Sequence, residues 1–381
     1  MPAAAYSLTL SRIRLRDFRN FADQELEVPP DGCAIVADNG RGKTNLLEAI
    51  YYLEIFRSFR GAPDAQLVRF GTDTFHLEGE VRGEDRAERL AAGFSRRGKI
   101  KKITVGGAEP ERLGDAIGRF GAVVFSPGDI VLVSGPPSGR RRYLDILLSL
   151  AEPGYLVALQ RYRQALQQRN ALLRQGAAAE LVASWNAGLV DWGSRVVSAR
   201  VRWTGASEPA FAEHYARIAG GAEARLSYHT TLPDIAGDES PTAEVLRSAF
   251  AAGLQRSAAS ELRRGNTLVG PHRDDLRFTL ATAGGQLDLR AYGSGGQQRT
   301  AAIALRMTEM DTVRAQRERA GVLLLDDVFA ELDQGRSARI ADWVAESRAQ
   351  VVLTAPRDGE FLPGGGVLER WTIRDGRIHP L

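Results

Sequence analysis

Hydrophobic and polar positions follow three patterns along the chain, and the first of them predicts strands. In the N-terminal part, apolar residues either alternate with polar ones or form short runs bounded by turn residues, and both are typical of β-structure. Strands are therefore predicted over 7–17, 25–28, 33–36, within 75–105 with turns at Gly83 and Gly98, and over 123–125. Residues 42–52 carry apolar side chains at helical spacing, which predicts a helix soon after the third strand.

The second pattern is helical, and the third returns to strands. From residue 140 to about residue 218, and again over 243–264, apolar residues recur every three or four positions. This spacing predicts amphipathic helices that pack together as a core. After Pro271 the strand pattern returns. The elements predicted there are strands over 276–280, 286–289, 322–325 and 351–354, and helices that begin near Ser294 and Ser337.

These patterns predict an α/β protein in which a helical insertion splits one domain. We expect the N-terminal part of the α/β lobe, a mixed sheet, over residues 1–125. A mostly helical second lobe is expected over 126–266, and the C-terminal part of the α/β lobe over 267–381.

Composition and charge exclude several classes of protein. Of the 381 residues 44% are hydrophobic, and 50 basic and 47 acidic residues leave a formal net charge of +3, which excludes wholesale disorder. The single cysteine, Cys33, excludes a disulfide framework and a cysteine-based zinc site. No apolar run approaches the roughly 20 residues of a membrane span, and the N-terminus lacks the plan of a signal peptide. We therefore expect a cytoplasmic protein with no membrane partner.

Residues 37–44 read ADNGRGKT and lie between a predicted strand and a predicted helix. They match the phosphate-loop pattern G-x-x-x-x-G-K-[ST], except that Ala37 replaces the first glycine. In such a loop backbone N–H groups hold phosphates, Lys43 would contact the β- and γ-phosphates, and Thr44 would bind Mg²⁺. The alternative is a plain surface turn. The nucleotide ligands expected here are Ala37, Asp38, Asn39, Gly40, Arg41, Gly42, Lys43, Thr44 and Asn45.

The apolar strand predicted over 322–325 is followed by two carboxylates, Asp326 and Asp327. A phosphate-loop ATPase needs a carboxylate at a strand end to hold Mg²⁺, and the next carboxylate can orient or deprotonate the attacking water. We therefore predict Asp326 as a metal ligand with Thr44, and both aspartates as catalytic residues with Lys43. Without the phosphate loop, the same pair is equally typical of a helix cap or a turn.

A glycine-rich segment at 293–299 precedes a predicted apolar helix. A serine followed by two glycines at a helix start favours anion binding by the helix N-terminus, although a linker has a similar composition. Four residues here are therefore candidates for binding an anion. They are Ser294, Gly295, Gly296 and Gln297.

Together the three segments resemble the head of ABC-type ATPases. In that superfamily the counterpart of residues 294–297 contacts the γ-phosphate of ATP held by the opposite subunit, so the resemblance implies a nucleotide-sandwiched dimer. It also implies that residues 294–297 are nucleotide ligands and that Ser294 acts in catalysis. Residues 331–333 resemble the loop that follows the second acidic motif. Thr354 falls where transporters have a switch histidine, and Asp327 falls where most of the superfamily has glutamate. Both departures predict slow hydrolysis.

Seven segments in the right order resemble the RecF recombination-repair family over nearly the whole chain. They are 15–21, 39–49, 56–60, 125–129, 140–145, 270–276 and 324–333. The roughly 250 residues between Thr44 and Ser294 lack the heptads of the chromosome-maintenance relatives. The resemblance implies an ATP-dependent dimer on DNA, released by slow hydrolysis. It implies gap repair and replication maintenance, in which RecR-type and RecO-type partners help to load a RecA-type recombinase. It also places Arg19 and Asn20 near the nucleotide.

Only four of the 50 basic residues are lysines, and three of these lie in one predicted hairpin turn at 96–102. The five basic side chains of this turn favour contact with DNA phosphates, and a solvated turn is the alternative. They are Arg96, Arg97, Lys99, Lys101 and Lys102. Arg57 and Arg60 are a second candidate surface. His272 and Arg273 fit either a functional role or a buried structural one.

Two other functions are compatible with the same residues. The ATPase subunit of a transporter would have a membrane partner and show no ATP-stimulated DNA binding. A DNA-binding scaffold with an inert nucleotide site would dimerise whether or not ATP is present.

Overall fold

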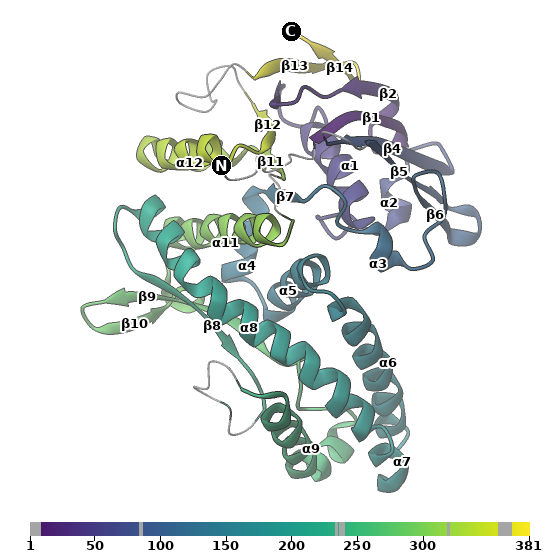
Figure 1. The fold of residues 1–381 in the computed structure, drawn as a ribbon, viewed down its shortest axis with the longest axis vertical. Coiled ribbons are helices and arrows are strands. Elements are labelled where there is room, and N and C mark those ends of the chain that lie inside the picture. The colour runs from purple at the N-terminus through teal and green to yellow at the C-terminus, as the bar shows by residue number, and fades with distance from the viewer. Residues whose placement is uncertain (1–8, 84–86, 233–234, 236–240, 318–320, 357–367) are drawn as a thin grey trace. The chain divides into compact units, whose positions relative to one another are not determined.

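The computed structural model describes residues 9–83, 87–232, 235, 241–317, 321–356 and 368–381 (Figure 1). The chain forms two compact units. We call residues 1–128 with 309–381 the sheet unit, and residues 129–308 the helical unit. The helical unit includes residues 267–308, which the sequence pattern groups with the α/β lobe. Within the described ranges, no helix combines the length and apolar character needed to cross a membrane.

One sheet of the sheet unit is antiparallel, with the strand order β2-β1-β4-β5-β6. Its strands are β1 (Thr9–Phe18), β2 (Phe21–Glu27), β4 (Thr74–Arg82), β5 (Ala87–Ser95) and β6 (Ile100–Val105). Along β4 buried and more exposed residues alternate, so one face of the sheet lies in the core. On that face the rings of Phe18 and Phe75 contact each other and Tyr52 edge to face. Residues 7 and 8 of the predicted first strand lie outside the described residues.

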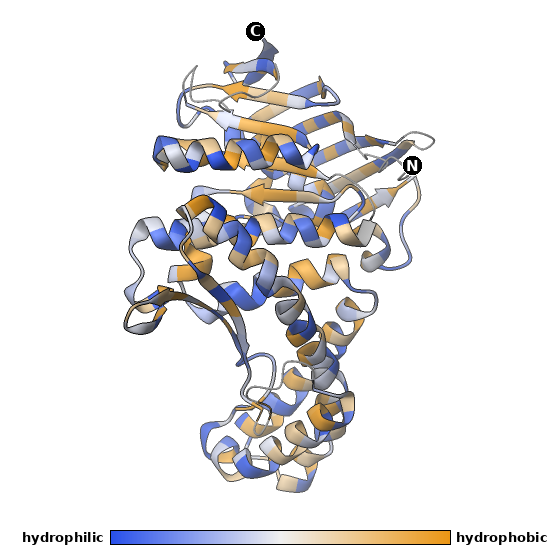
Figure 2. Cartoon of the chain, turned by 60° about the vertical axis from the view of Figure 1, so that its left-hand side comes forward, coloured by the Kyte–Doolittle hydropathy of each residue, from blue (hydrophilic) through white to orange (hydrophobic). Residues whose placement is uncertain are grey.

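The second sheet has the order β14-β13-β3-β12-β11-β7. Its strands are β3 (Gly32–Val36), β7 (Ala122–Phe125), β11 (Val322–Asp326), β12 (Gln350–Ala355), β13 (Glu369–Arg374) and β14 (Arg377–Pro380). The four strands from β3 to β7 pair in parallel and are almost wholly buried, which explains their uninterrupted apolar runs. Figure 2 shows both kinds of strand, some orange throughout and others alternating between orange and blue.

Helices cover the faces of these sheets. Helix α1 (Lys43–Ile55) contacts strands of both sheets, so it is buried over most of its length. The other helices that lie wholly within the sheet unit are α2 (Asp64–Leu67), α3 (Leu113–Ala116) and α12 (Gln334–Ser347). Near the end of α1, the Glu54 carboxylate accepts the N–H groups of Phe120 and Gly121, each at 3.1 Å, and so fixes the start of β7.

The helical unit combines long helices with a three-stranded antiparallel sheet of order β10-β9-β8. Its strands are β8 (Ala224–His229), β9 (Asp275–Thr282) and β10 (Gly285–Asp288). Its helices are α4 (Ile130–Ser134), α5 (Pro137–Ala151), α6 (Tyr155–Arg174), α7 (Ala179–Ala183), α8 (Asn186–Ala219), α9 (Ala243–Arg264), α10 (Leu289–Tyr292) and the first part of α11 (Gly295–Arg317).

The elements predicted from the sequence are present, with ends shifted by a few residues. Three strands, β8, β13 and β14, are missing from the prediction. The last two form a hairpin whose turn is Asp375-Gly376, with φ of 49° and 71°. Asp-Gly between alternating residues is a strong signal for such a hairpin, so the sequence contained the information.

Candidate functional site

The carboxyl ends of three neighbouring parallel strands bring the predicted residues of the sheet unit together. Asp326 at the end of β11 lies opposite Thr354 of β12, and Ala355 of β12 lies opposite Val36 at the end of β3. Because β3 leads directly into the phosphate loop at 37–42, the loop and the acid pair meet at one edge of the sheet. This edge is where open α/β sheets bind their ligands.

The phosphate loop makes a tight turn that requires a glycine at position 42. Gly42 has a φ of 106°, and a Cβ there would lie 2.4 Å from the Asn20 side chain. Asn20 Nδ2 donates to the backbone oxygen of Arg41 at 3.2 Å, and Asn45 Nδ2 donates to Asn20 Oδ1 at 2.7 Å. Ala37 lies outside the positive-φ region, so alanine replaces the first glycine of the pattern without backbone strain.

Lys43, the first residue of α1, is held over the loop. Its side chain is only 4% exposed, and its ammonium donates to Ala37 O at 2.8 Å and to Asn39 Oδ1 at 3.1 Å. The same nitrogen lies 3.4 Å from Asp327 Oδ2. The lysine therefore joins the phosphate loop to the acid pair.

Asp326 lies between two threonine hydroxyls. Thr44 Oγ1 is 2.8 and 3.1 Å from its two carboxylate oxygens, and Thr354 Oγ1 is 3.1 Å from Oδ1. Burial raises the pKa of Asp326, the hydrogen bond from Thr44 opposes this, and the neighbouring Asp327 raises the pKa again. A negative charge is thus held where water stabilises it poorly.

Asp327 has an uncommon backbone conformation, with a φ of 46°. Aspartate enters this left-handed region more readily than most residues, and such conformations concentrate at functional sites. Its backbone N–H donates to Thr354 Oγ1 at 3.0 Å, and the same hydroxyl lies 3.0 Å from Asp327 Oδ1. The two carboxylates therefore share Thr354, while only Asp327 pairs with Lys43.

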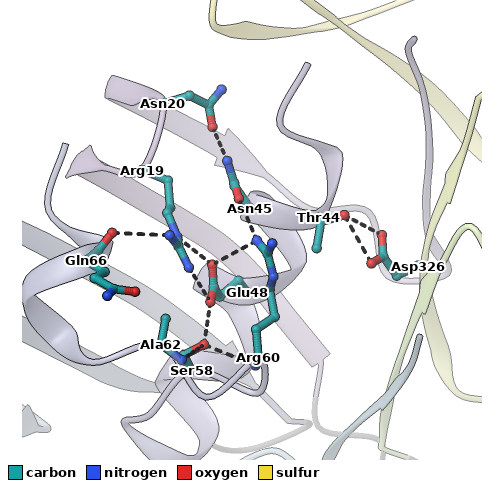
Figure 3. A network of polar contacts seen from close by, with 10 residues as sticks. All are labelled: Arg19, Asn20, Thr44, Asn45, Glu48, Ser58, Arg60, Ala62, Gln66 and Asp326. Atoms are coloured by element: carbon teal, nitrogen blue, oxygen red, sulfur yellow. Dashed lines mark hydrogen bonds and ion pairs between the residues drawn. The ribbon is translucent and has the colours of Figure 1, made fainter. Parts of the chain in front are cut away.

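A second network beside the loop is centred on Glu48 of α1 (Figure 3). The buried carboxylate accepts from Arg19 at 2.8 and 3.0 Å and from the Ser58 hydroxyl. Arg60 Nη1 lies 3.9 Å from the same carboxylate and donates to Asn45 Oδ1 at 3.4 Å. Arg19 and Arg60 are thereby fixed next to the phosphate loop.

The sequence prediction gave no role to Glu48 or Ser58. Both side chains are almost wholly buried, at 0% and 1% exposure. A glutamate inside the apolar helix LLEAIYYLEI was the available signal, because a buried carboxylate needs a cationic or hydrogen-bonding partner. Arg57, the neighbour of Ser58, is exposed.

Residues 294–297 belong to the helical unit and form the start of α11. Gln297 N–H donates to Ser294 Oγ at 3.3 Å, and Ser294 N–H donates to Gln297 Oε1 at 2.8 Å. This reciprocal capping satisfies two backbone donors at the helix start. Ser294 and Gly295 are exposed, and a Cβ on Gly295 would meet no atom within 4 Å, so packing within the described chain does not require this glycine.

Two of the five basic residues in the predicted hairpin serve the fold. Arg96 donates through its guanidinium to three backbone carbonyls of the segment 65–72. Lys101 donates to the Phe56 carbonyl and to Asp64 Oδ2 at 3.1 Å, and lies over the Tyr52 ring. Burial lowers the pKa of Lys101.

The other three cations of the hairpin are at the surface. Arg97 is 88% exposed and lies 3.5 Å from Asp73, and Lys102 is 68% exposed and lies 2.8 Å from Glu109. Lys99 is exposed as well. Exposed ion pairs contribute little to the stability of the fold, so these side chains can leave their carboxylate partners for DNA phosphates.

His272 is held at both ring nitrogens. Nε2 lies 3.0 Å from the Thr267 carbonyl and must donate to it, so Nδ1 accepts from the Tyr162 hydroxyl at 2.5 Å. Burial lowers the pKa of His272 to about 4, which leaves the ring neutral near pH 7. Arg273 donates to the same carbonyl at 3.3 Å. These contacts favour the structural interpretation of both residues.

A phosphate loop, a strand-end acid pair and a serine-glycine helix start on this fold define the class of ABC-type ATPase heads. The Smc head domain from Pyrococcus furiosus shares the fold, with a TM-score of 0.57 and 18% identity over 98% of this chain and 96% of that one. The predicted fold class is confirmed.

The chain belongs to the RecF family of DNA replication and repair proteins. It is 38% identical to RecF of Salinibacter ruber over 93% of this chain and 87% of the relative. It is 36% identical to RecF of Synechococcus sp. (strain JA-3-3Ab) over 97% of both chains. A solved RecF–ATP structure matches with a TM-score of 0.90 and 30% identity over all of both chains. No family model matches the sequence.

Proposed function

We propose that the chain is an ATP-dependent DNA-binding protein of recombinational gap repair and replication maintenance. The observation that carries the proposal is the cluster at the sheet edge, in a chain of the RecF family. There Thr44 lies 2.8 Å from Asp326, and Lys43 lies 3.4 Å from Asp327. A relative described as RecF–ATP supports ATP as the nucleotide.

ATP binding would redirect groups that now contact one another. The Lys43 ammonium would leave Ala37 O and Asn39 Oδ1 for the β- and γ-phosphates, where it makes stronger charge-assisted hydrogen bonds. The loop amides from residue 37 to residue 45 would surround the phosphates. Asn20 would keep the loop in shape through its bonds to Arg41 and Asn45.

The residues present fit Mg²⁺. Asp326 is a buried carboxylate whose pKa is raised by burial, and the Thr44 hydroxyl lies against it, so a cation between them would relieve the desolvated charge. Mg²⁺ is usually held by one or two protein groups together with substrate phosphates. Thr44 and Asp326 would hold the ion, and its charge would stabilise the transferred phosphoryl group.

We propose that hydrolysis is slow and serves as a switch. Asp327 would orient or deprotonate the attacking water, but its side chain is one methylene shorter than the glutamate of most relatives in the superfamily. Thr354 already contacts both aspartates, and a hydroxyl does not take up a proton near pH 7 as a histidine can. A turnover as fast as that of transport ATPases would contradict this part of the proposal.

ATP is proposed to close a homodimer. Ser294, Gly295, Gly296 and Gln297 of one copy would contact the γ-phosphate held by the phosphate loop of the other. Their exposed helix start supports this, since its backbone donors and the positive end of the α11 dipole favour an anion. Ser294 would act on the transferred phosphoryl group, and hydrolysis would reopen the dimer.

The dimer is proposed to bind DNA at gaps, at junctions of single and double strands or on duplex DNA, in the cytoplasm. The exposed cations Arg97, Lys99 and Lys102 are the hairpin residues best placed to contact phosphates, and Arg57 and Arg60 are a second candidate surface. A relative is described as a recombination mediator in the RecFOR pathway. We therefore propose RecR-type and RecO-type partners, with which the protein helps to load a RecA-type recombinase.

Light scattering with and without ATP and duplex DNA tests the proposal. The expected result is a monomer without ATP, a dimer with ATP, and a DNA complex that requires ATP. Dimerisation that ignores ATP would indicate a scaffold with an inert nucleotide site. An ATP dimer that never binds DNA would contradict the DNA-binding function and match the behaviour expected of a transporter subunit.

A further inference from the structure

The helical unit contains a cavity of about 230 Å³ that the nucleotide site does not use. It is formed by the first turns of α5, by α6, by Arg200 of α8 and by the Pro271–His272 loop. Of the described residues, four arginines and one carboxylate line it. They are Arg141, Arg142, Arg163, Arg200 and Asp145.

The most deeply buried arginines of this unit each pair with a carboxylate. Three of them are at most 2% exposed, and each has a carboxylate 2.7 Å away. The pairs are Arg140–Asp275, Arg169–Glu261 and Arg200–Asp145. The unit thus follows the rule that a buried charge needs a partner.

Arg141 departs from this rule. It is only partly exposed, and within the described part of the chain no carboxylate pairs with it; its guanidinium donates to the backbone oxygen of Asp274 at 2.9 Å. Burial lowers the pKa of Arg141 and the nearby Arg200 lowers it further, while the carboxylates of Asp275, Asp274 and Asp145, which lie farther off, only partly oppose this. A guanidinium has five N–H donors, so most of those of Arg141 are left for a ligand.

The one carboxylate of the cavity wall is already shared. Asp145 accepts from the Tyr155 hydroxyl at 2.8 Å, and from Arg163 and Arg200 at 2.7 Å each. Arg200 also donates to the Pro271 carbonyl at 2.7 Å. Asp145 therefore cannot neutralise a further cation in the cavity.

The start of α5 makes this excess of positive charge more unusual. Its sequence is PSGRRR, with Ser138 and Arg141 on the cavity wall, and there is no acidic residue in the first turn. The helix dipole favours an anion at the first turn, where Ser138 lies, and Arg141 follows in the second turn. A bound anion would offset the repulsion among the arginines, and it would interact favourably with the helix dipole.

We propose that this cavity binds a phosphate group of the DNA backbone, with Arg141 and Arg163 as its main ligands. Planar guanidinium groups match the oxygens of phosphate in two-point contacts. Arg163 is 58% exposed at the rim, so a phosphate that is part of a polymer can reach it. The proposal rests on the proposed function, because it takes DNA as the source of the phosphate.

The salt dependence of DNA binding tests the proposal, with the full-length protein, ATP and a duplex. Arg141→Gln and Arg163→Gln should each reduce the slope of log affinity against log salt by about one, with ATP affinity unchanged. Arg161→Gln is the matched control, because this exposed arginine of α6 is outside the cavity lining. Arg141→Lys should restore part of the slope.

The outcomes separate this proposal from the function on which it rests. A wild-type protein that fails to bind DNA with ATP overturns the proposed function, and the DNA assignment of the cavity with it. Wild-type binding with unchanged slopes in both variants overturns the cavity proposal alone. If Arg141→Gln does not fold, Arg163→Gln decides, because Asp145 keeps its bonds to Arg200 and Tyr155.

Inorganic phosphate distinguishes the two sources of the ligand. In a Lys43→Met background, which removes the main phosphate ligand of the nucleotide loop, phosphate should raise the melting temperature little, because a free phosphate lacks the further contacts that DNA makes elsewhere on the protein. A phosphate-induced rise that requires Arg141, with unchanged DNA slopes, would show a free-phosphate site and overturn the assignment to DNA.

Discussion

The phosphate loop and the segment 294–297 are both predicted to touch the same γ-phosphate, yet they are built differently. In the sheet unit, Lys43 is buried and its ammonium contacts the loop and Asp327. In the helical unit, Ser294 is exposed, and its hydroxyl and backbone N–H both bond Gln297. The first is a cluster of opposite charges, and the second is a helix start in which Ser294 and Gln297 cap each other.

This difference indicates which of the two segments determines the affinity for ATP and which one contacts ATP only after a second copy has bound it. The charged cluster has a strong internal reason to bind phosphate and Mg²⁺, because a buried carboxylate and a buried ammonium are already in place. The helix start offers backbone donors, the uncharged side chains of Ser294 and Gln297 and a dipole, whose interactions are individually weak. We infer that the first half-site determines ATP affinity and that the second adds a contact only when another copy supplies bound ATP.

Replacing Lys43 should have the largest effect. Lys43→Met removes the ammonium and should weaken ATP binding about 100-fold or more, since hydrogen bonds to charged groups contribute about 1.5–3 kcal/mol each. Dimerisation and DNA binding should be lost with it. Titration with a fluorescent ATP analogue measures the affinity, and Lys102→Met serves as the control for removal of an exposed lysine. Wild-type affinity in Lys43→Met would contradict the assignment of the loop.

Ser294→Arg should separate the two half-sites. ATP affinity should stay within about twofold of wild type, because Ser294 contributes nothing to the charged cluster of its own chain, while the ATP dimer should disappear from light scattering. The lost cap costs only about 1 kcal/mol. Ser294→Thr, which keeps the capping hydroxyl, should still dimerise. If Ser294→Arg dimerises with ATP, the sandwich arrangement is wrong.

The lysines of the hairpin also differ in this way, since Lys101 is bonded within the fold whereas Lys99 and Lys102 are exposed. Lys99→Ala with Lys102→Ala should reduce the salt slope of DNA binding by about two, because both ammonium groups are at the surface. Lys101→Ala should leave the slope unchanged and lower the melting temperature, because it takes the cation from Asp64 and from the Tyr52 ring.

Lys101→Ala is therefore the matched control for the double variant. It removes the same side chain from the same hairpin, but from the inner side. Salt titrations of duplex binding, read beside thermal melts, give both quantities. A slope that changes only in Lys101→Ala would reverse the assignment of the hairpin faces.

The sequence predicts the fold wherever periodicity is strong. The parallel strands are buried on both faces and appear as apolar runs, and α9 matches its predicted range of 243–264. Strand β8 was missed although apolar and polar residues alternate along Ala224–His229, so the signal was present there but covered only a short segment. The grouping of residues 267–308 with the helical unit depends on tertiary contacts, which local patterns do not contain.

The sequence predicts the charged residues of the candidate site but not their internal partners. The spacing of Lys43 and Thr44 and the strand-end position of Asp326 follow from motifs. That Lys101 faces inward does not, because its neighbour Lys102 has the same chemistry, and only the pleat of β6 places the two on opposite faces. Glu48 was missed because its partners, Arg19 and Ser58, are distant in sequence.

The smallest effect expected is also the one that measures the cost of the charged cluster. Ionised Asp326 is disfavoured by burial and by Asp327, so its raised pKa means that the folded state loses stability as pH rises through that value. Asp326→Asn removes the charge and keeps an oxygen for Thr44, so the nucleotide-free protein should melt about 2 °C higher at pH 7.

Asp333→Asn is the matched control of opposite sign. Asp333 caps α12, and the hydrogen bond from the Arg336 N–H holds its pKa below the usual range. Its ionised form therefore stabilises the fold near pH 7, and this stability is lost as the pH falls through the lowered pKa. Its replacement should lower the melting temperature slightly.

Mg²⁺-ATP should then raise the melting temperature of the wild type and of Asp333→Asn, and raise that of Asp326→Asn much less. If Asp326→Asn instead melts lower than wild type without nucleotide, the buried carboxylate stabilises the empty site, and the argument that it is held there for a cation fails.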